Sequence, residues 1–279
     1  MTKLFLRDWS VKAVKNSVIT EVKDFKGISV SFDIEKSIDR GINKGSITLY
    51  NLQESYRRFL AQKNISIELQ AGYIDGGLVS IFSGDVELCD PELRGTNWET
   101  KLEVRDGAKI TRATEAKKSF KKGASIKGLF DYLIGLLVAS SDPNIVPLTK
   151  GSIDLSMIKG SLSKGKSISG NAYEELFKLC RDYSLELFVT DGVLNIAGYR
   201  SNILTETVSI SRSSGLIGTP EITDDGVKCY VLLQKGIYPG QIFSLDSSEA
   251  KGEYYVKNAK YKGDSKSNPW GIEIEALTA

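Results

Sequence analysis

Apolar and polar residues alternate along much of the first 110 positions. From Ile28 to Ile34 every second residue is apolar, and the stretch 65–73 follows the same rhythm. A period of two places successive side chains on opposite faces of an extended chain, which is typical of a half-buried strand. Turn residues such as Asp75-Gly76-Gly77 separate these stretches. Alternation or β-branched and aromatic composition predicts strands over 28–34, 46–50, 65–73, 79–88 and 98–104.

Two segments interrupt this pattern. The stretch 51–60 places apolar residues at helical spacing after Asn51, which predicts a short helix capped by that asparagine. Asp33 to Lys44 is polar, charged and contains glycine, so we expect an exposed loop or hairpin tip there. Six or so strands with one short helix favour a closed barrel or a sandwich with the helix on its flank.

The pattern changes between residues 111 and 199. Ala116 to Gly123 holds four lysines and is interpreted as a basic linker. Ser125 and Asn171 each precede a stretch with apolar residues at helical spacing, so two helices are expected. Asp191-Gly192 between two apolar stretches predicts a tight hairpin. These features indicate a small α+β module.

Strand patterns return from 200 to 279. Asp225-Gly226 predicts a hairpin in which the glycine adopts a positive φ, and Pro239-Gly240 predicts a second turn. From Ile272 to Ala276 the residues alternate, so one face of this strand is expected to contact solvent or a polar lumen. The predicted fold is therefore mainly β (α+β), with a β domain at 1–110, an α+β module at 111–199 and a second β domain at 200–279.

Composition narrows the classes of function. The net charge of +2 and the charged fraction of 26% give no field that would favour duplex DNA or an anionic membrane as the main partner. The chain has no histidine, which excludes Ser-His-Asp and Cys-His nucleophile systems and His-ligated zinc. Its three cysteines lack metal spacing and are expected to be free thiols. Without an apolar leader or an 18-residue apolar run, folding in a cytoplasm is expected.

Candidate chemical groups are few. Asp85 and Asp106 each neighbour a glycine, and with Glu87 they are the carboxylates that a wall hydrolase or carbohydrate-binding site would use. Turn and strand-end aspartates account for the same pattern. The lysines at 117–122 could contact phosphate, but we interpret them as part of a solvated interdomain linker. We therefore predict no catalytic, cofactor-binding or metal-binding residue.

The succession of motifs resembles a known family. In the first part of the chain, residues 47–52 lead into a helix and are followed by Gly72-Tyr73, residues 81–86 and Asp106-Gly107. The middle part runs from Phe120 to the 191–192 hairpin. The last part contains residues 214–220 and Pro239-Gly240. This order is similar to that of the baseplate hub proteins of contractile-tailed bacteriophages, the late control protein D-like tail hubs. The resemblance covers nearly the whole chain.

The resemblance implies a structural virion protein. Such hubs carry two tail-tube-like β-barrel domains per subunit, with the α+β module inserted between them, and a homotrimer forms a ring that joins the sixfold tail tube to the threefold spike. Expected partners are the tube protein, the spike protein, and baseplate wedge or other hub-proximal proteins. DNA is expected only transiently in the channel, and no stable membrane insertion is expected. The expected location is the tail baseplate, after assembly in the host cytoplasm.

Assembly regions follow from the same resemblance. The turns and corners expected to shape subunit contacts are at Asp33, Lys44, Gly215, Pro220, Tyr238, Pro239 and Gly240. The alternative function is a carboxylate-based cell-wall hydrolase or a carbohydrate-binding tail protein. A related contractile injection machine is an equally suitable setting for the hub.

Overall fold

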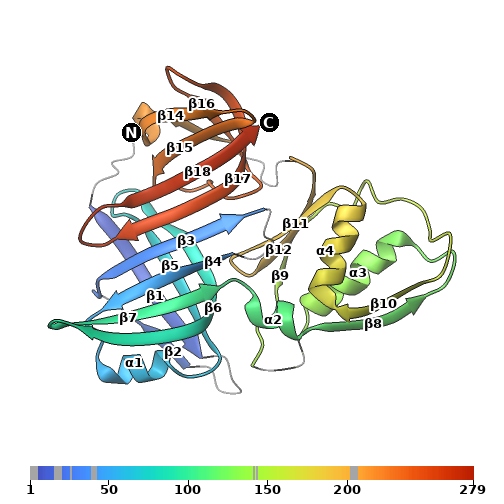
Figure 1. Ribbon diagram of the computed structural model, residues 1–279, viewed down its shortest axis with the longest axis horizontal. Coiled ribbons are helices and arrows are strands. Elements are labelled where there is room, and N and C mark those ends of the chain that lie inside the picture. Colours follow the sequence, from blue (N-terminus) through green and yellow to red (C-terminus); the bar gives the residue numbers. More distant parts are fainter. Residues whose placement is uncertain are drawn as a thin grey trace.

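The computed structural model describes residues 6–15, 21–25, 27–38, 43–140, 142, 144–201 and 207–279. It is mainly β, as predicted, with one 13-stranded sheet and a smaller α+β module beside it (Figure 1). Strands β3 and β17 join the N-terminal and C-terminal strands into this single sheet. Its strands are β1 Arg7–Lys15, β2 Glu21–Asp24, β3 Val30–Ser37, β4 Lys44–Tyr50, β5 Ile65–Tyr73, β6 Gly77–Arg94, β7 Asn97–Arg105, β13 Val208–Ser211, β14 Leu216–Thr223, β15 Gly226–Leu232, β16 Ile242–Asp246, β17 Lys251–Asp264 and β18 Trp270–Thr278.

The main path through the sheet runs β14-β15-β18-β17-β3-β4-β7-β6-β5-β1-β2. Among the described residues, no strand pairing closes either β region into a separate barrel. The reason lies in the length of β17, whose first residues pair with β16 and whose last residues pair with β3. One strand therefore serves both regions, and the sheet continues from one to the other.

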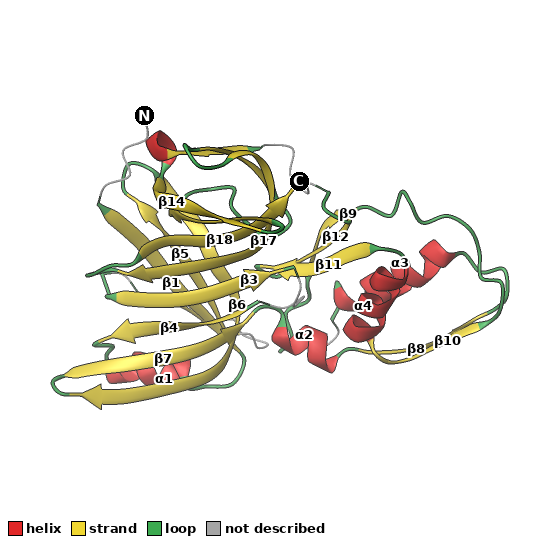
Figure 2. Ribbon diagram, turned by 45° about the horizontal axis from the view of Figure 1, so that its top comes forward, coloured by secondary structure: helices red, strands yellow, loops and turns green. Residues whose placement is uncertain are grey.

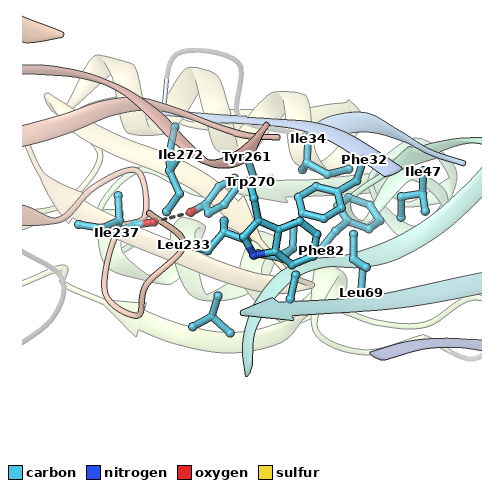
Figure 3. Packing of buried hydrophobic residues seen from close by; sticks show 14 of the residues in the cluster. Phe32, Ile34, Ile47, Leu69, Phe82, Leu233, Ile237, Tyr261, Trp270 and Ile272 are labelled. Carbon is cyan, nitrogen blue, oxygen red and sulfur yellow. Dashed lines mark hydrogen bonds between the residues drawn. The ribbon is translucent and has the colours of Figure 1, made fainter. Parts of the chain in front are cut away.

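One hydrophobic core lies beneath this sheet. Phe32 from the N-terminal strands and Trp270 from the C-terminal strands meet edge to face, with ring centroids 5.6 Å apart. The hydroxyl of Tyr261 donates a hydrogen bond to the carbonyl of Ile237 in the same cluster (Figure 3). The core therefore takes residues from both ends of the chain. Large apolar side chains from distant parts of the sequence stabilise the sheet jointly.

The α+β module has a hydrophobic core of its own, built from residues between Ile110 and Ile196. Helices α3 and α4 lie between a two-stranded sheet and a three-stranded sheet (Figures 1 and 2). The domain boundaries predicted at residues 110 and 199 stay predictions. The elements are α2 Ala108–Ala113, β8 Glu115–Phe120, α3 Ile126–Leu137, β9 Thr149–Ile153, β10 Lys166–Asn171, α4 Ala172–Asp182, β11 Leu185–Thr190 and β12 Val193–Gly198.

Several local predictions are confirmed. The Asn171 side chain accepts a hydrogen bond from the Glu174 amide at 3.0 Å and caps α4. Asp191 and Gly192 have φ values of 53° and 77° and form the turn between β11 and β12. Gly240 has the positive φ expected for its turn, at 86°. Among the described residues, no helix is long and apolar enough to cross a membrane.

Other local predictions are wrong. Asp33 to Ser37 is not a loop but part of β3, because pairing with both β4 and β17 satisfies its backbone despite its polar sequence; residues 39–42 lie outside the described part. Helix α1 (Glu54–Leu60) begins after Gln53, while Asn51 has a φ of 55° and bonds to the backbone of Trp98. The 116–123 segment is not a linker, since most of it is strand β8.

Gly226 also differs from the prediction. It is the first residue of β15, and the turn before it is formed by Asp224 and Asp225. A Cβ atom at Gly226 would lie 2.0 Å from the carbonyl oxygen of Ala276 on the neighbouring strand. Glycine is required there by a close backbone approach rather than by a positive φ.

Candidate functional site

The outer face of the large sheet is covered by charged side chains of both signs. Register places Glu273 opposite Lys260, Lys260 opposite Glu35, and Glu35 opposite Lys44 across four neighbouring strands. Alternate positions of each strand point away from the core, so polar residues gather on one side. We call the following set the charged face: Asp33, Glu35, Lys44, Glu103, Arg105, Lys260, Lys262 and Glu273.

Charges on this face neutralise one another. Lys260 Nζ lies 3.4 Å from Asp33 Oδ2, and Lys262 Nζ lies 2.8 Å from Glu273 Oε1. The eight named residues comprise four acidic and four basic side chains, so this set carries no net charge. Opposite charges on adjacent strands stabilise the pairing modestly, by roughly 0.2–1 kcal/mol per pair. The resulting surface is polar and well hydrated, and it exerts little long-range attraction on a polyanion.

A second polar feature joins the α+β module to the sheet. The turn between β11 and β12 places Asp191 against β3 and β6, where its carboxylate lies 2.8 Å from Lys36 Nζ. The Ser83 amide and the Ser80 hydroxyl also donate to Asp191, at 3.1 and 3.0 Å. The Lys36 side chain is fully buried. A buried ammonium requires such a partner, so this ion pair fixes the module's position.

Asp106 is buried beside this ion pair. Its Oδ1 accepts a hydrogen bond from the Gly192 amide at 2.7 Å, and Asn43 Nδ2 lies 3.4 Å from its Oδ2. Burial, followed by the negative charge of Asp191, raises the pKa of Asp106 to about 7. We call Lys36, Asn43, Asp106 and Asp191 the buried junction.

The hydrolase candidates are partly brought together. Asp85 and Asp106 line one pocket of about 280 Å³. Asp85 accepts from the Lys109 amide at 3.1 Å, while the Asp106 side chain is fully covered. Glu87 lines a second pocket together with Asp85, and it pairs with Arg112 at 2.7 Å and with Arg105 at 3.4 Å. All three carboxylates are thus engaged by the chain's own donors, and within the described residues no His, Cys, Asp and Glu group is arranged to hold a metal ion.

The predicted assembly residues have two different placements. Asp33 and Lys44 belong to the charged face. The other five lie in the C-terminal β region: Gly215 and Pro220 are buried near β14, Pro239 and Gly240 are buried in the turn before β16, and Tyr238 is half-buried. Tyr238 also carries Lys36 Nζ over its ring, 5.5 Å from the centroid. Burial suits these residues to shaping strand corners, and their role in assembly stays a prediction.

Sequence reasoning missed the buried junction. Lys36 lies in a polar stretch that predicted a loop, and a lysine is almost never fully buried unless it is paired. The available signal was the strict alternation from Val30 onwards, which continues through Ile34 and places residue 36 on the inner face. Its partner, Asp191, lies 155 residues away, so no local pattern indicates the pairing.

Comparison with known proteins decides the family. The sequence model described as baseplate hub gp41 matches residues 14–276. The chain belongs to this baseplate hub family. No curated protein matches the sequence at a significant level.

Solved structures share the fold of this hub chain at low sequence identity. A 43 kDa tail protein of prophage MuSo2 from Shewanella oneidensis superimposes with a TM-score of 0.66, at 10% identity over 98% of both chains. A tail protein from Neisseria meningitidis gives 0.63, at 12% identity over 96% of both chains.

A third similar structure comes from a secretion machine. The Escherichia coli c3393 protein, a component of the type VI secretion system, gives a TM-score of 0.61 at 8% identity, over 90% of the hub chain and 74% of its own. These likenesses concern the fold alone, which is therefore one found in phage tail proteins and in a secretion-system component.

Proposed function

We propose that this hub chain is a structural protein that forms a homotrimeric ring between the sixfold tail tube and the threefold spike of a contractile tail or a related injection machine. Family membership supports a baseplate location. The chain has two β regions, one at each end of the sequence, joined by one sheet. Three copies would therefore present six β regions around an axis, which matches sixfold symmetry above and threefold symmetry below.

The charged face is the observation that carries the proposal. A channel for DNA needs a hydrated wall that neither repels nor holds phosphate, and a face of balanced charges meets that requirement. We propose that this face lines the channel and that DNA contacts it only during genome ejection. The tube protein, the spike protein and wedge or other hub-proximal proteins are the stable partners, assembled in the host cytoplasm.

Light scattering coupled to size-exclusion chromatography tests the oligomer. With the spike protein present, the proposal predicts a complex containing three copies of this 30.6 kDa chain. A single copy or a dimer per spike at saturating concentration contradicts the ring. Glu35→Lys together with Glu103→Lys should leave this stoichiometry intact while making the face basic, which slows DNA ejection in reassembled particles.

A carboxylate hydrolase is the second candidate, because Asp85 and Asp106 share a pocket and the pKa of Asp106 is raised to about 7. The test is incubation with peptidoglycan followed by analysis of the released fragments. If wild type releases peptidoglycan fragments and the Asp85→Asn variant does not, the protein is an enzyme and the proposal of a purely structural role is wrong. We expect no release, because both carboxylates are occupied by hydrogen bonds within the chain.

A further inference from the structure

Two adjoining segments of the α+β module carry only one sign of charge. Residues 116–128 and 159–170 run antiparallel: β8 pairs with β10, and a bridge joins Ser125 to Ser161 farther along. The two segments contain no aspartate or glutamate. Their exposed lysines, which we call the lysine ribbon, are Lys117, Lys118, Lys121, Lys122, Lys127, Lys159, Lys164 and Lys166.

The ribbon lacks neutralising partners inside the chain. Among the described residues, none of its lysines forms an ion pair, in contrast to the charged face. Outside the two segments, acidic residues outnumber basic ones. The positive charge of the molecule is therefore concentrated at one place, and the β8–β10 pair extends away from the large sheet (Figures 1 and 2). Mutual repulsion makes such a cluster unfavourable for the isolated chain.

Protection of strand edges does not account for the ribbon. Lysines on edge strands prevent pairing between copies, and Lys117 and Lys118 on β8 suffice for that. Lys122, Lys127 and Lys159 lie outside the paired strands, where there is no ladder to protect. Their position next to the strand lysines widens the basic surface beyond the strands.

We infer that the lysine ribbon docks a carboxylate-rich surface of another protein. No large apolar side chain is exposed within the two segments, so the ribbon offers nothing to insert into a lipid layer. Phe120 and Tyr132 pack edge to face with ring centroids 5.9 Å apart, and Lys118 covers both rings, so no aromatic platform is free for stacked bases.

Serine hydroxyls complete the surface. Ser119 and Ser167 face each other across the strands at 3.0 Å, between Lys117 and Lys121. Hydroxyls can donate to carboxylates, and lysines steer an acidic partner over long distances. The choice of protein over duplex DNA rests on the proposed function, in which DNA passes through the channel without being held.

The test uses the full chain and a short fluorescein-labelled polyglutamate peptide, with binding followed by fluorescence anisotropy at low salt. Duplex DNA of matched charge is the second probe. The ribbon variant carries Lys117→Gln, Lys121→Gln, Lys122→Gln and Lys164→Gln. The matched control replaces four exposed lysines elsewhere and carries Lys63→Gln, Lys101→Gln, Lys228→Gln and Lys235→Gln.

We expect the ribbon variant to bind polyglutamate about tenfold more weakly and with a shallower salt dependence, while the control changes less than about twofold. Equal losses in the two variants would overturn the inference, because net charge alone would then explain binding. Tighter binding of wild type to DNA than to polyglutamate would overturn it in favour of a phosphate partner. Light scattering of the wild type and the ribbon variant, each mixed with the spike protein, reports the trimer separately, so failure of the ribbon and failure of the hub role are distinguishable.

Discussion

At the residue scale, Lys36 and Asp191 connect the α+β module to the large sheet through a buried ion pair. Lys36→Met removes the ammonium group and keeps most of the side-chain volume. It leaves the Asp191 carboxylate without its cation, so we expect the free energy of unfolding to fall by about 3 kcal/mol. Urea denaturation measures this loss.

The matched control is Lys260→Met, which breaks the ion pair with Asp33 on the charged face. Lys260 is 36% exposed, so water replaces the lost contact and the expected loss is below about 1 kcal/mol. Similar losses in both variants would show that the buried pair does not hold the module.

Asp106 gives the stability of the fold a pH dependence. Its pKa is about 7 in the folded chain, against an ordinary value of 3.8 for an aspartate, so the folded state keeps a proton that the unfolded chain releases. The stabilising contribution is complete below about pH 4 and is lost as the pH rises through about 7, an effect on the order of 4 kcal/mol. Asp106→Asn cannot titrate, so the difference in unfolding free energy between wild type and variant should shift against wild type over this range. A constant difference between pH 4 and pH 7.5 would contradict the assignment.

At the element scale, β17 is the strand that joins the two β regions. Gly263 lies where β17 pairs with β3, and a Cβ atom there would lie 2.2 Å from the ring of Phe32. We expect Gly263→Ala to lower the free energy of unfolding by about 1–3 kcal/mol, because the ring must move within a packed core. Thermal unfolding followed by circular dichroism provides the measurement.

Gly135→Ala in α3 is the control for this substitution, since nothing lies within 4 Å of a Cβ atom at that position. Alanine favours a helix over glycine by about 0.5–1 kcal/mol, so the variant should be as stable as wild type or more stable. A Gly263→Ala protein that also unfolds at or above the wild-type temperature would argue against close packing between β3 and β17.

Sequence patterns over a few residues predicted individual helices, strands and turns well, but they did not predict which distant strands pair. The α4 cap and the turn at Asp191-Gly192 depend on residues within a few positions of one another, so the sequence indicates them. The β3–β17 pairing joins Ile34 to Tyr261, and alternation cannot specify a partner so distant. The loop prediction was wrong for Asp33 to Ser37, because Asp33 and Glu35 lie on the solvated face of β3 and Lys36 is buried against a partner 155 residues away.

At the scale of the whole molecule, charge is distributed in two contrasting ways. The charged face is balanced by cross-strand ion pairs, whereas the lysine ribbon has no acidic residue in its segments. A balanced surface suits passage of a polyanion, and a single-sign surface suits recognition of an acidic partner. The charged face follows in part from the alternation of Ile272 to Ala276. The lysine ribbon cannot be predicted from either segment alone, because it forms where the two lysine-rich segments pair.

The measurement that tests the hub account most directly is a cryo-electron microscopy reconstruction of the parent particle's baseplate. The account predicts three copies of the chain where tube meets spike, with Glu35, Lys260 and the rest of the charged face turned toward the central channel and the lysine ribbon outside it. A chain located at the periphery of the baseplate, or a ring whose charged face points away from the channel, would contradict it.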